Sequence, residues 1–427
     1  MVVSTNRNSG IDGPLQLEFQ EAGTPMSPLI RTPLFLLIAA LASLLLSSCS
    51  EQASSSLYDP SATSKPQPTI TSVTPAGSAV AGMDTLILQG TNYSSVQTEN
   101  TVFFNDKSAT LLSVTPMQIT LRAPLEIGDS IAIRVAVSGS IPFSNTILYT
   151  LEAAVVTFGD LSKTELSTSL ATDTAGNLYA GHTSSGVEGG ILKFTSAGIR
   201  SIYALATSGV PVWTSLKMGP GGYLYAARNS RLIARFSPGG GTSAETWLTF
   251  PVGTFISDID FDQTGNLWGG GNNTKIYRIE PNATITSYTF VGNVRSLRVF
   301  NDYLYFAART ADGEKIWRAQ ISPSGLGTPE VYFDFSLAYP TCTPRAITLS
   351  SDGVLYIGTD APYGIVVVDP AKAYIAPFEA YEAMFGTGLS YLAWGSSGSL
   401  YASTVEGILL EFRVRGQQSA PYYGSTL

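Results

Sequence analysis

The sequence predicts an all-β protein in which a small antiparallel β-sandwich is followed by a six-bladed β-propeller. Composition is the first observation, because 41 Gly, 24 Pro and only 13% charged residues among 427 favour many short strands joined by tight turns. The second is a series of short apolar–polar alternations between residues 68 and 152. The third is a motif that recurs six times between residues 155 and 415.

The N-terminal region contains an apolar run of 14 residues, 33–46, preceded by Arg31. A membrane-spanning helix needs about 20 such residues, so this run has the length of a signal-peptide core. The tetrapeptide LSSC that ends at Cys49 resembles a bacterial lipobox. This resemblance implies that Cys49 is lipidated on sulfur and becomes the mature N-terminus. The alternative is an ordinary secretory signal in which this cysteine is incidental.

The start of the chain is unusual for a signal peptide. Residues 1–25 carry acidic residues and no basic cluster, whereas a signal of ordinary length would begin at Met26. We therefore expect residues 1–25 to be a mis-called extension and residues 26–48 to be the signal peptide. Residues 49–67 then form the lipidated cysteine and a Ser-rich flexible tether. These features predict a lipid-anchored protein of the bacterial cell envelope, at the outer membrane or cell surface, with the membrane as one partner.

Charge and cysteine content argue against several classes of protein. The net charge of 24 − 32 = −8 argues against a nucleic-acid partner. One His and two Cys leave no structural zinc module and no disulfide framework. After signal cleavage only Cys342 keeps a free thiol, and we interpret it as a half-buried structural thiol because no base pairs with it in the sequence.

Residues 68–152 form the first predicted folded domain. The segment resembles an IPT/TIG domain at Pro68, in the turn Gly90-Thr91-Asn92-Tyr93, at Phe104 and at Ser144-Asn145. This resemblance implies an immunoglobulin-like β-sandwich that acts as a spacer or as an adhesive module.

The repeated motif consists of a turn, a Leu and an aromatic residue. The six aromatic residues are Tyr179, Tyr225, Trp268, Tyr305, Tyr356 and Tyr401, at separations of 46, 43, 37, 51 and 45 residues. An apolar strand precedes each motif, a third strand follows it, and a more polar fourth strand often comes next, which is typical of propeller blades. Because strand side chains alternate, we expect each Leu to pack on one face of its blade and each aromatic on the other.

The ring predicted from residues 153–415 lacks a clear fourth strand after its sixth blade. Residues 154–159 resemble the other fourth strands. We therefore expect them to form the outer strand of the last blade and to close the ring. Residues 416–427 would then be a tail.

The repeats resemble those of NHL-type and gluconolactonase-like propellers, most closely at ISDIDFDQTGNLW, residues 256–268. This resemblance implies a ligand site at the mouth of the central channel, where lactonase-like families hold a divalent metal with oxygen ligands. The positions ten residues before each motif aromatic should surround that mouth; they are Ser169, Ser215, Asp258, Arg295, Ala346 and Tyr391. One acid in six does not make a metal ring, so no cofactor is predicted, and Asp258 remains the one candidate ligand for a divalent metal.

Other chemical candidates are isolated in the sequence. The carboxylates of Asp258, Asp260 and Asp262 alternate along one strand, which is typical of a polar strand-to-turn edge, although it also permits a calcium site. His182 is the only imidazole, and we interpret it as a solvated loop residue because no nucleophile motif accompanies it. Candidate binding residues on the ring face, of types that favour protein or sugar recognition, are Trp213, Arg231, Asp258, Asn272, Arg309, Asp360 and Tyr363.

The preferred functional hypothesis is a lipid-anchored envelope protein that presents its propeller as a non-catalytic binding or scaffolding surface. Its partner would be an envelope protein or a glycan, and the chain would act as a monomer. One alternative is a metal-dependent hydrolase, lactonase or lyase that acts at the channel mouth. The other is an adhesive or structural surface protein that acts through the sandwich domain.

Overall fold

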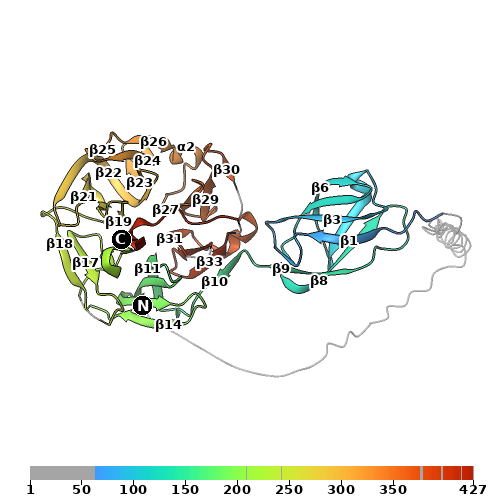
Figure 1. Cartoon of the computed structure of the whole chain (residues 1–427), viewed down its shortest axis with the longest axis horizontal. Helices are drawn as coiled ribbons and strands as arrows, with labels where there is room; N and C mark the ends of the chain where they lie inside the picture. Colours follow the sequence, from blue (N-terminus) through green and yellow to red (C-terminus); the bar gives the residue numbers. More distant parts are fainter. Residues whose placement is uncertain are drawn as a thin grey trace, which may run out of the picture. The chain divides into compact units, whose positions relative to one another are not determined.

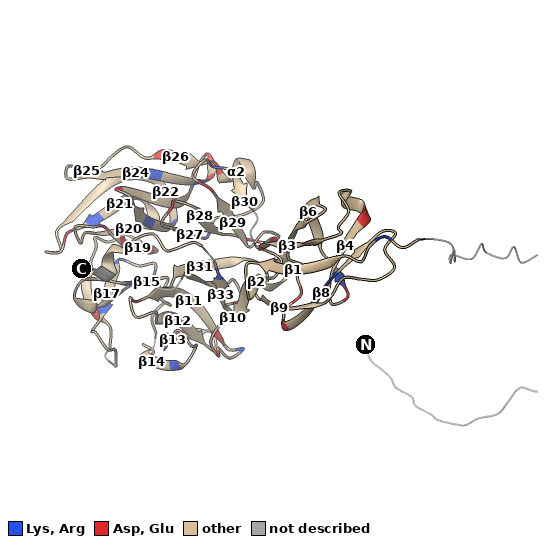
Figure 2. Cartoon of the chain, turned by 45° about the vertical axis from the view of Figure 1, so that its right-hand side comes forward, with Lys and Arg blue, Asp and Glu red and all other residues tan. Residues whose placement is uncertain are grey.

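The computed structural model describes residues 63–426, apart from positions 208, 242, 376–377, 396–397 and 415. The predicted signal peptide, Cys49 and most of the tether lie outside the described residues. Within the described part, no helix combines the length and apolarity that are needed to cross a bilayer. The chain from Ser64 onward forms one compact unit, and its charged side chains are few and scattered (Figure 2).

The first domain is a sandwich of two sheets around one apolar core, as predicted. The first sheet has the order β1 (Thr69–Thr74), β3 (Thr85–Thr91), β7 (Gln118–Arg122) and β6 (Thr110–Thr115). The second has the order β2 (Ser78–Val80), β9 (Ile147–Glu152), β8 (Gly128–Val137), β4 (Asn100–Phe104) and β5 (Lys107–Ser108). Inward-facing residues of both sheets, such as Leu86, Phe104 and Ile133, are fully buried together.

The second domain is a ring of six blades, each an antiparallel meander of four strands (Figure 1). Blade 1 contains β11 (Glu165–Thr172), β12 (Leu178–Ser184), β13 (Val187–Phe194) and β14 (Arg200–Ala204). Blade 2 contains β15 (Ser215–Met218), β16 (Leu224–Ala227), β17 (Leu232–Phe236) and β18 (Glu245–Thr249). Blade 3 contains β19 (Asp258–Phe261), β20 (Leu267–Gly270), β21 (Asn272–Ile279) and the first part of β22 (Ile285–Phe300).

The remaining three blades follow the same plan. Blade 4 contains the second part of β22, then β23 (Tyr303–Thr310), β24 (Gly313–Ser322) and β26 (Glu330–Phe333), and β25 (Gly325–Leu326) also pairs with β24. Blade 5 contains β27 (Ala346–Leu349), β28 (Leu355–Gly358), β29 (Ile365–Val368) and β30 (Tyr374–Ile375). Blade 6 contains β31 (Leu389–Trp394), β32 (Ser399–Thr404), β33 (Leu409–Arg413) and β10 (Val155–Thr157).

The ring closes through β10, as the sequence predicted. This strand pairs antiparallel with β33, with Val155 opposite Phe412 and Thr157 opposite Leu410. Backbone hydrogen bonds from Arg413 N to Ala154 O (2.7 Å) and from Phe158 N to Leu409 O (2.9 Å) flank this pairing. The segment before blade 1 therefore completes blade 6, and no edge of that blade is left unpaired next to β33.

The repeated motif forms the interfaces between blades. All six Leu and all six aromatic residues of the motif are buried. The aromatic residue of each blade shares an apolar cluster with the Leu of the next: Tyr179 with Leu224, Tyr225 with Leu267, Trp268 with Leu304, Tyr305 with Leu355, Tyr356 with Leu400, and Tyr401 with Leu178. The predicted opposite packing of Leu and aromatic is therefore confirmed, and the last pair joins blade 6 to blade 1.

The turns before the motif aromatics are held by side chains as well as by backbone. Asp262 accepts hydrogen bonds from the backbone N–H groups of Thr264 and Asn266 and from Nε1 of Trp268 (2.8–2.9 Å). Gly265 supplies the positive φ of 82° that this turn requires. Asp262 is thus a turn residue, as its position at the end of an alternating run suggested.

Because neighbouring strands are antiparallel, the connections alternate between the two ends of the channel. We call the end with the turns between first and second strands the turn face. The opposite end carries the loops between second and third strands and the crossovers between blades, and we call it the mouth face.

The C-terminal segment, residues 416–426, is not a free tail and corrects that prediction. It crosses the turn face and is drawn in red near the ring centre in Figure 1. In blade 5, Ser351 N donates to Gln418 O (2.8 Å) and Ala420 N donates to Leu349 O (3.1 Å). On the other side of the ring, Tyr422 Oη donates to Met218 O of blade 2. The segment thus connects blade 5 to blade 2 across the channel.

Tyr381 links the two domains. It belongs to a short 3-10 helix (Glu379–Met384) between blades 5 and 6. Its hydroxyl accepts a hydrogen bond from Ala154 N (2.8 Å) and donates one to Ala81 O of the sandwich (2.9 Å). The buried side chain of Val80 belongs to the same apolar cluster as Tyr381.

Candidate functional site

The mouth of the channel is built by the first strands of the blades. Five of the six positions predicted to surround it line one small cavity of about 30 Å³: Ser215, Asp258, Arg295, Ala346 and Tyr391. Blade 1 contributes Leu170 to this lining, next to the predicted Ser169. The ten-residue spacing therefore located the inner strand of nearly every blade.

Asp258 is occupied by donors from its own and neighbouring blades. Its Oδ1 accepts from Ser215 Oγ (2.5 Å) and Ile259 N (3.0 Å), and its Oδ2 accepts from Leu297 N (2.8 Å) and Arg298 Nη1 (3.0 Å). Burial opposes its charge, but the nearby guanidinium of Arg298 and the ammonium of Lys217 prevail and lower the pKa of Asp258. This carboxylate therefore links blades 2, 3 and 4, and both of its oxygens are already engaged by donors of the ring.

Asp260 lies one step deeper in the channel. Its Oδ2 accepts from Val299 N (2.8 Å), whereas its Oδ1 makes no hydrogen bond to the described residues and lies 3.8 Å from Lys217 Nζ. Burial raises the pKa of Asp260 and lowers the pKa of Lys217 to about 8. The pair is buried among the inner strands of the ring.

Two arginines present nitrogen donors at the mouth. Arg345 uses its Nε to bind Asp360 Oδ1 (2.5 Å), and its side chain is 39% exposed. Arg295 uses Nη1 to bind Glu314 Oε2 (2.5 Å) and is 22% exposed. Tyr391 lies near Arg345 and Asp258, and burial raises the pKa of its hydroxyl to about 12. This hydroxyl therefore stays protonated at neutral pH.

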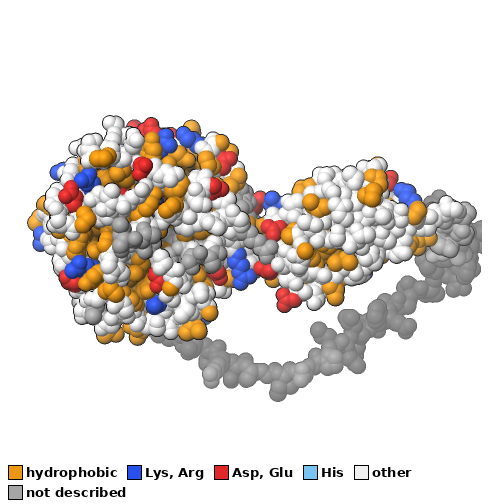
Figure 3. Space-filling model, viewed as in Figure 1, with side chains coloured by type: hydrophobic (Ala, Val, Ile, Leu, Met, Phe, Trp, Pro, Cys, Tyr) orange, Lys and Arg blue, Asp and Glu red, His pale blue; other side chains and the backbone are white. Residues whose placement is uncertain are grey.

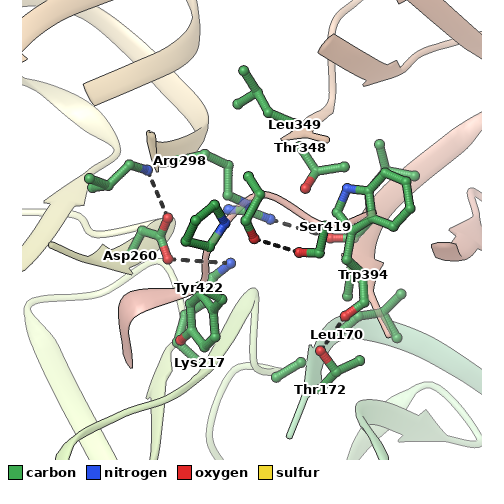
Figure 4. A pocket seen from close by; sticks show the side chains of 16 residues that line it. Leu170, Thr172, Lys217, Asp260, Arg298, Thr348, Leu349, Trp394, Ser419 and Tyr422 are labelled. Atoms are coloured by element: carbon green, nitrogen blue, oxygen red, sulfur yellow. Dashed lines mark hydrogen bonds and ion pairs between the residues drawn. The ribbon is translucent and has the colours of Figure 1, made fainter. Parts of the chain in front are cut away.

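A second cavity of about 60 Å³ lies between the inner strands and the C-terminal segment (Figure 4). Asp260, Lys217 and Trp394 line it together with Tyr422 of that segment. Trp394 Nε1 and Asp260 Oδ1 are both buried without a hydrogen-bond partner among the described residues. The cavity has the polarity and the room for ordered water, but the C-terminal segment separates it from the turn face.

The mouth face also exposes apolar side chains. Large apolar residues that are at least 39% exposed occur on most of its loops and strand starts: Leu166, Val187, Leu205, Val252, Phe255, Val291, Leu337 and Val405. Val252 and Leu337 reach 88% and 82% exposure. The turn face, which carries the C-terminal segment, is the face shown in Figure 3.

The structure brings together only part of the predicted binding set. Asp258 lines the mouth, and Asp360 braces Arg345, which lines it. Trp213 is buried between blades 1 and 2, where the guanidinium of Arg228 lies 3.4 Å above its ring. It is therefore a packing residue and not the exposed contact that was expected.

The other predicted residues are dispersed. Tyr363 packs against Tyr339, with ring centroids 5.0 Å apart. Arg231, Asn272 and Arg309 are exposed on separate loops or strand ends of the mouth face. Sequence reasoning missed Arg345, Arg298 and Lys217 as mouth-lining residues. The sequence could have indicated them only through their positions, because each lies within three residues of a position predicted to surround the mouth.

His182 differs from the prediction of a solvated loop residue. It lies on β12, which runs on to Ser184, and is only 4% exposed. Its Nδ1 is 3.2 Å from Gly190 O and its Nε2 is 3.8 Å from Glu165 Oε1. Burial lowers the pKa of His182. The imidazole is a packed residue of blade 1, where it faces a carbonyl oxygen and a paired carboxylate.

Cys342 is buried as a free thiol, with Sγ 3.7 Å from Ala361 O. Across the described part of the chain, no three His, Cys, Asp or Glu side chains gather in a way that could hold a metal ion. Asp258 belongs to no such group among the described residues.

Comparison with known proteins agrees with the fold. Residues 68–151 match the family model of the IPT/TIG domain, and no curated protein sequence matches the chain. A candidate phosphatase from Bacteroides thetaiotaomicron superposes with a TM-score of 0.53 at 13% identity, over 83% of this chain and 98% of its own.

Two further solved structures each cover somewhat less than two thirds of this chain. A luciferin-regenerating enzyme gives a TM-score of 0.52 at 13% identity, over 64% of this chain and 99% of its own. A gluconolactonase from Xanthomonas campestris gives a TM-score of 0.49 at 14% identity, over 62% of this chain and 89% of its own. At these identities the likeness concerns fold alone: the chain is an all-β protein with an IPT/TIG immunoglobulin-like domain followed by a β-propeller.

Proposed function

We propose that this protein is a lipid-anchored, monomeric component of a bacterial cell envelope that uses the mouth face of its propeller as a non-catalytic binding surface. The IPT/TIG domain serves as the spacer between the anchor and the propeller. The partner is an envelope protein or an envelope glycan.

One contrast within the propeller carries this proposal. Asp258, the acidic residue that lines the mouth cavity, already accepts four hydrogen bonds from the ring itself. The loops around the mouth instead expose apolar side chains such as Val252 and Leu337. Exposed apolar residues beside partly exposed arginines are typical of recognition surfaces.

The anchor rests on the sequence. The apolar run, the small residues and Cys49 occur in the order that a lipoprotein signal needs. Mass spectrometry of the protein purified from its membranes should find a lipid-modified N-terminal Cys49. Cys49→Ala should move the protein out of the membrane fraction, whereas Cys342→Ala should leave it there. An unmodified, soluble wild-type protein would overturn the anchor.

Binding to isolated envelope fractions, measured by co-sedimentation, tests the surface. The exposed apolar residues around the mouth face form what we call the apolar rim. We expect the triple variant V252K/V291K/L337K to lose about tenfold or more in affinity, because it places charges on this rim. The matched control I199K/I202K alters side chains of similar exposure at the outer edge of blade 1 and should bind as the wild type does. Equal loss in both variants would overturn the assignment of the surface.

The two alternative functions give different outcomes in the same set of experiments. Loss of binding in M117K/L148K, which alters exposed side chains of the sandwich, would favour adhesion through that domain. Hydrolysis of a lactone that requires calcium, manganese or zinc and disappears in Asp258→Asn would favour the metal-dependent enzyme. Either result would displace the proposed function.

A further inference from the structure

We propose that the channel mouth binds the carboxylate group of a ligand through Arg345, Arg295 and Tyr391. This inference rests on the proposed binding role of the mouth face and names the chemistry that the mouth recognises. An acidic sugar and an acidic amino-acid side chain share this group, and the experiment below distinguishes them.

Arg345 is the principal donor. Its contact with Asp360 uses only Nε, so that both Nη groups remain without a hydrogen bond to the described residues. Thr343 N also donates to this carboxylate (3.1 Å), which fixes it in place. A guanidinium held from behind by a carboxylate presents its two Nη groups as a fork, and that fork matches the two oxygens of a carboxylate.

Arg295 adds donors from the neighbouring blade. Glu314 engages its Nη1, while Nε and Nη2 form no hydrogen bond to the described residues. The two acids that hold these arginines, Asp360 and Glu314, do not line the mouth cavity. The cations therefore face the cavity and their counter-charges lie behind them.

The charge of the cavity lining favours an anion. Lys217, Arg295, Arg298 and Arg345 line the cavity, and Asp258 is the acidic residue among them. The oxygens of Asp258 already accept four hydrogen bonds, so they leave the mouth donors free for a ligand. A carboxylate that enters the mouth cavity would therefore meet the unused N–H donors of Arg345 and Arg295 and would not face the unpaired oxygen of an acidic residue.

Tyr391 supplies a neutral donor from blade 6. Its ring lines the cavity, and its hydroxyl makes no hydrogen bond to the described residues. Arg295, Arg345 and Tyr391 belong to three consecutive blades, 4, 5 and 6. They therefore approach the axis of the ring from different directions. The enclosed space of about 30 Å³ admits a small planar group, while the rest of the ligand stays at the open mouth.

Titration calorimetry of the full chain tests this proposal with four probes: sodium glucuronate, glucose, N-acetylglutamate and inorganic phosphate. We expect glucuronate to bind at least about tenfold more tightly than glucose, since one charge-assisted hydrogen-bond pair corresponds to about that factor. Tighter binding of N-acetylglutamate than of glucuronate would support the carboxylate site and assign the ligand to acidic peptides. Equal binding of glucose and glucuronate, or preferential binding of phosphate, would overturn it.

Variants locate the site. Arg345→Gln should weaken glucuronate binding about tenfold, and Arg345→Lys should lose a large part of it because lysine lacks the fork. Tyr391→Phe removes one donor and should cost about threefold. Arg235→Gln is the control, because Arg235 pairs with Glu245 on the outer part of blade 2. Unaltered binding in a folded Arg345→Gln protein would overturn the proposal.

The outcomes separate this inference from the proposed function. If the apolar-rim variant loses envelope binding but no carboxylate probe binds, the proposed function stands and the carboxylate site falls. If glucuronate binds through Arg345 while the apolar-rim variant keeps its envelope binding, the carboxylate site stands and the wider docking surface falls.

Discussion

Lys217 and Asp260 form a buried pair of opposite charges whose contribution depends on both partners being present. Their side chains are 9% and 3% exposed, and Nζ lies 3.8 Å from Oδ1. Burying each charge is costly, and the mutual attraction and the bond from Val299 N offset only part of that cost.

Removing one partner of this pair should lower the free energy of unfolding more than removing both partners. We expect Lys217→Met to lower the free energy of unfolding by about 3 kcal/mol, because it leaves the buried Asp260 carboxylate without its ion-pair partner and with only the more distant charge of Arg298. Adding Asp260→Asn should restore at least half of that loss. Urea unfolding monitored by fluorescence measures both changes, and additive losses in the double variant would contradict this account.

Glu165 couples stability to pH. The hydrogen bond from Arg200 is the main reason that the pKa of Glu165 falls from 4.5 to about 2. A carboxyl with a lower pKa in the folded state stabilises the fold above pH 4.5 and loses that contribution as the pH falls toward 2. The melting temperature should therefore drop across this window, and more steeply in the wild type than in Glu165→Gln. Parallel curves for the two proteins would refute the assignment.

For individual residues, the sequence predicted positions in the ring but not the contacts that fix their roles. The spacing from each motif aromatic placed Ser215, Asp258, Arg295, Ala346 and Tyr391 around one opening. It could not show that Leu297 N and Arg298 would saturate Asp258, because those donors come from the next blade. The burial of Trp213 depends on its contact with Arg228, which follows the second strand of the same blade, and on its packing against residues of blade 1.

The short strand β10 closes the ring, because it is the fourth strand of blade 6. Val156 lies opposite Glu411, between the flanking backbone bonds at Ala154 and Phe158. Its own N–H is in register to donate to β33.

A proline in β10 should open the ring. Val156→Pro removes that N–H donor and should lower the melting temperature by several degrees, consistent with a loss of about 3 kcal/mol. Val156→Thr keeps the backbone bond and should melt close to the wild type. Differential scanning calorimetry of the full chain compares them, and equal melting of the proline variant and the wild type would show that blade 6 does not depend on β10.

Most blade strands could be predicted because each is marked by local chemistry. The motif turns need a residue at positive φ, and Gly176, Gly265, Gly353 and Gly398 adopt it with φ between 79° and 86°. The continuous β22 was not predicted, since no residue within it signals that one strand serves two blades. The crossing path of the C-terminal segment was also missed because it has no apolar periodicity and is fixed only by contacts with blades 5 and 2.

For the whole molecule, the C-terminal segment is a second link across the ring. It joins blade 5 through Ala420 and blade 2 through Tyr422, and it covers the cavity lined by Trp394.

Ending the chain after Gly416 should therefore lower the melting temperature and open the channel. Acrylamide should then quench the fluorescence of Trp394, which is only 7% exposed in the intact protein. Tyr422→Phe loses one hydrogen bond and should cost only about 1 kcal/mol, with no new quenching. Unchanged melting and quenching in the truncated chain would show that the segment merely rests on the ring.

Both links that secure the ring depend on residues that follow the first five blades in the chain. The partner of β10 is β33, which is made after five complete blades, and Tyr422 comes later still. While the first blades are being synthesised, blade 1 has no blade 6 to pack on, and Leu178 lacks the ring of Tyr401. The ring can therefore close only after β33 and Tyr422 have been synthesised, so its two links form late and not progressively along the chain.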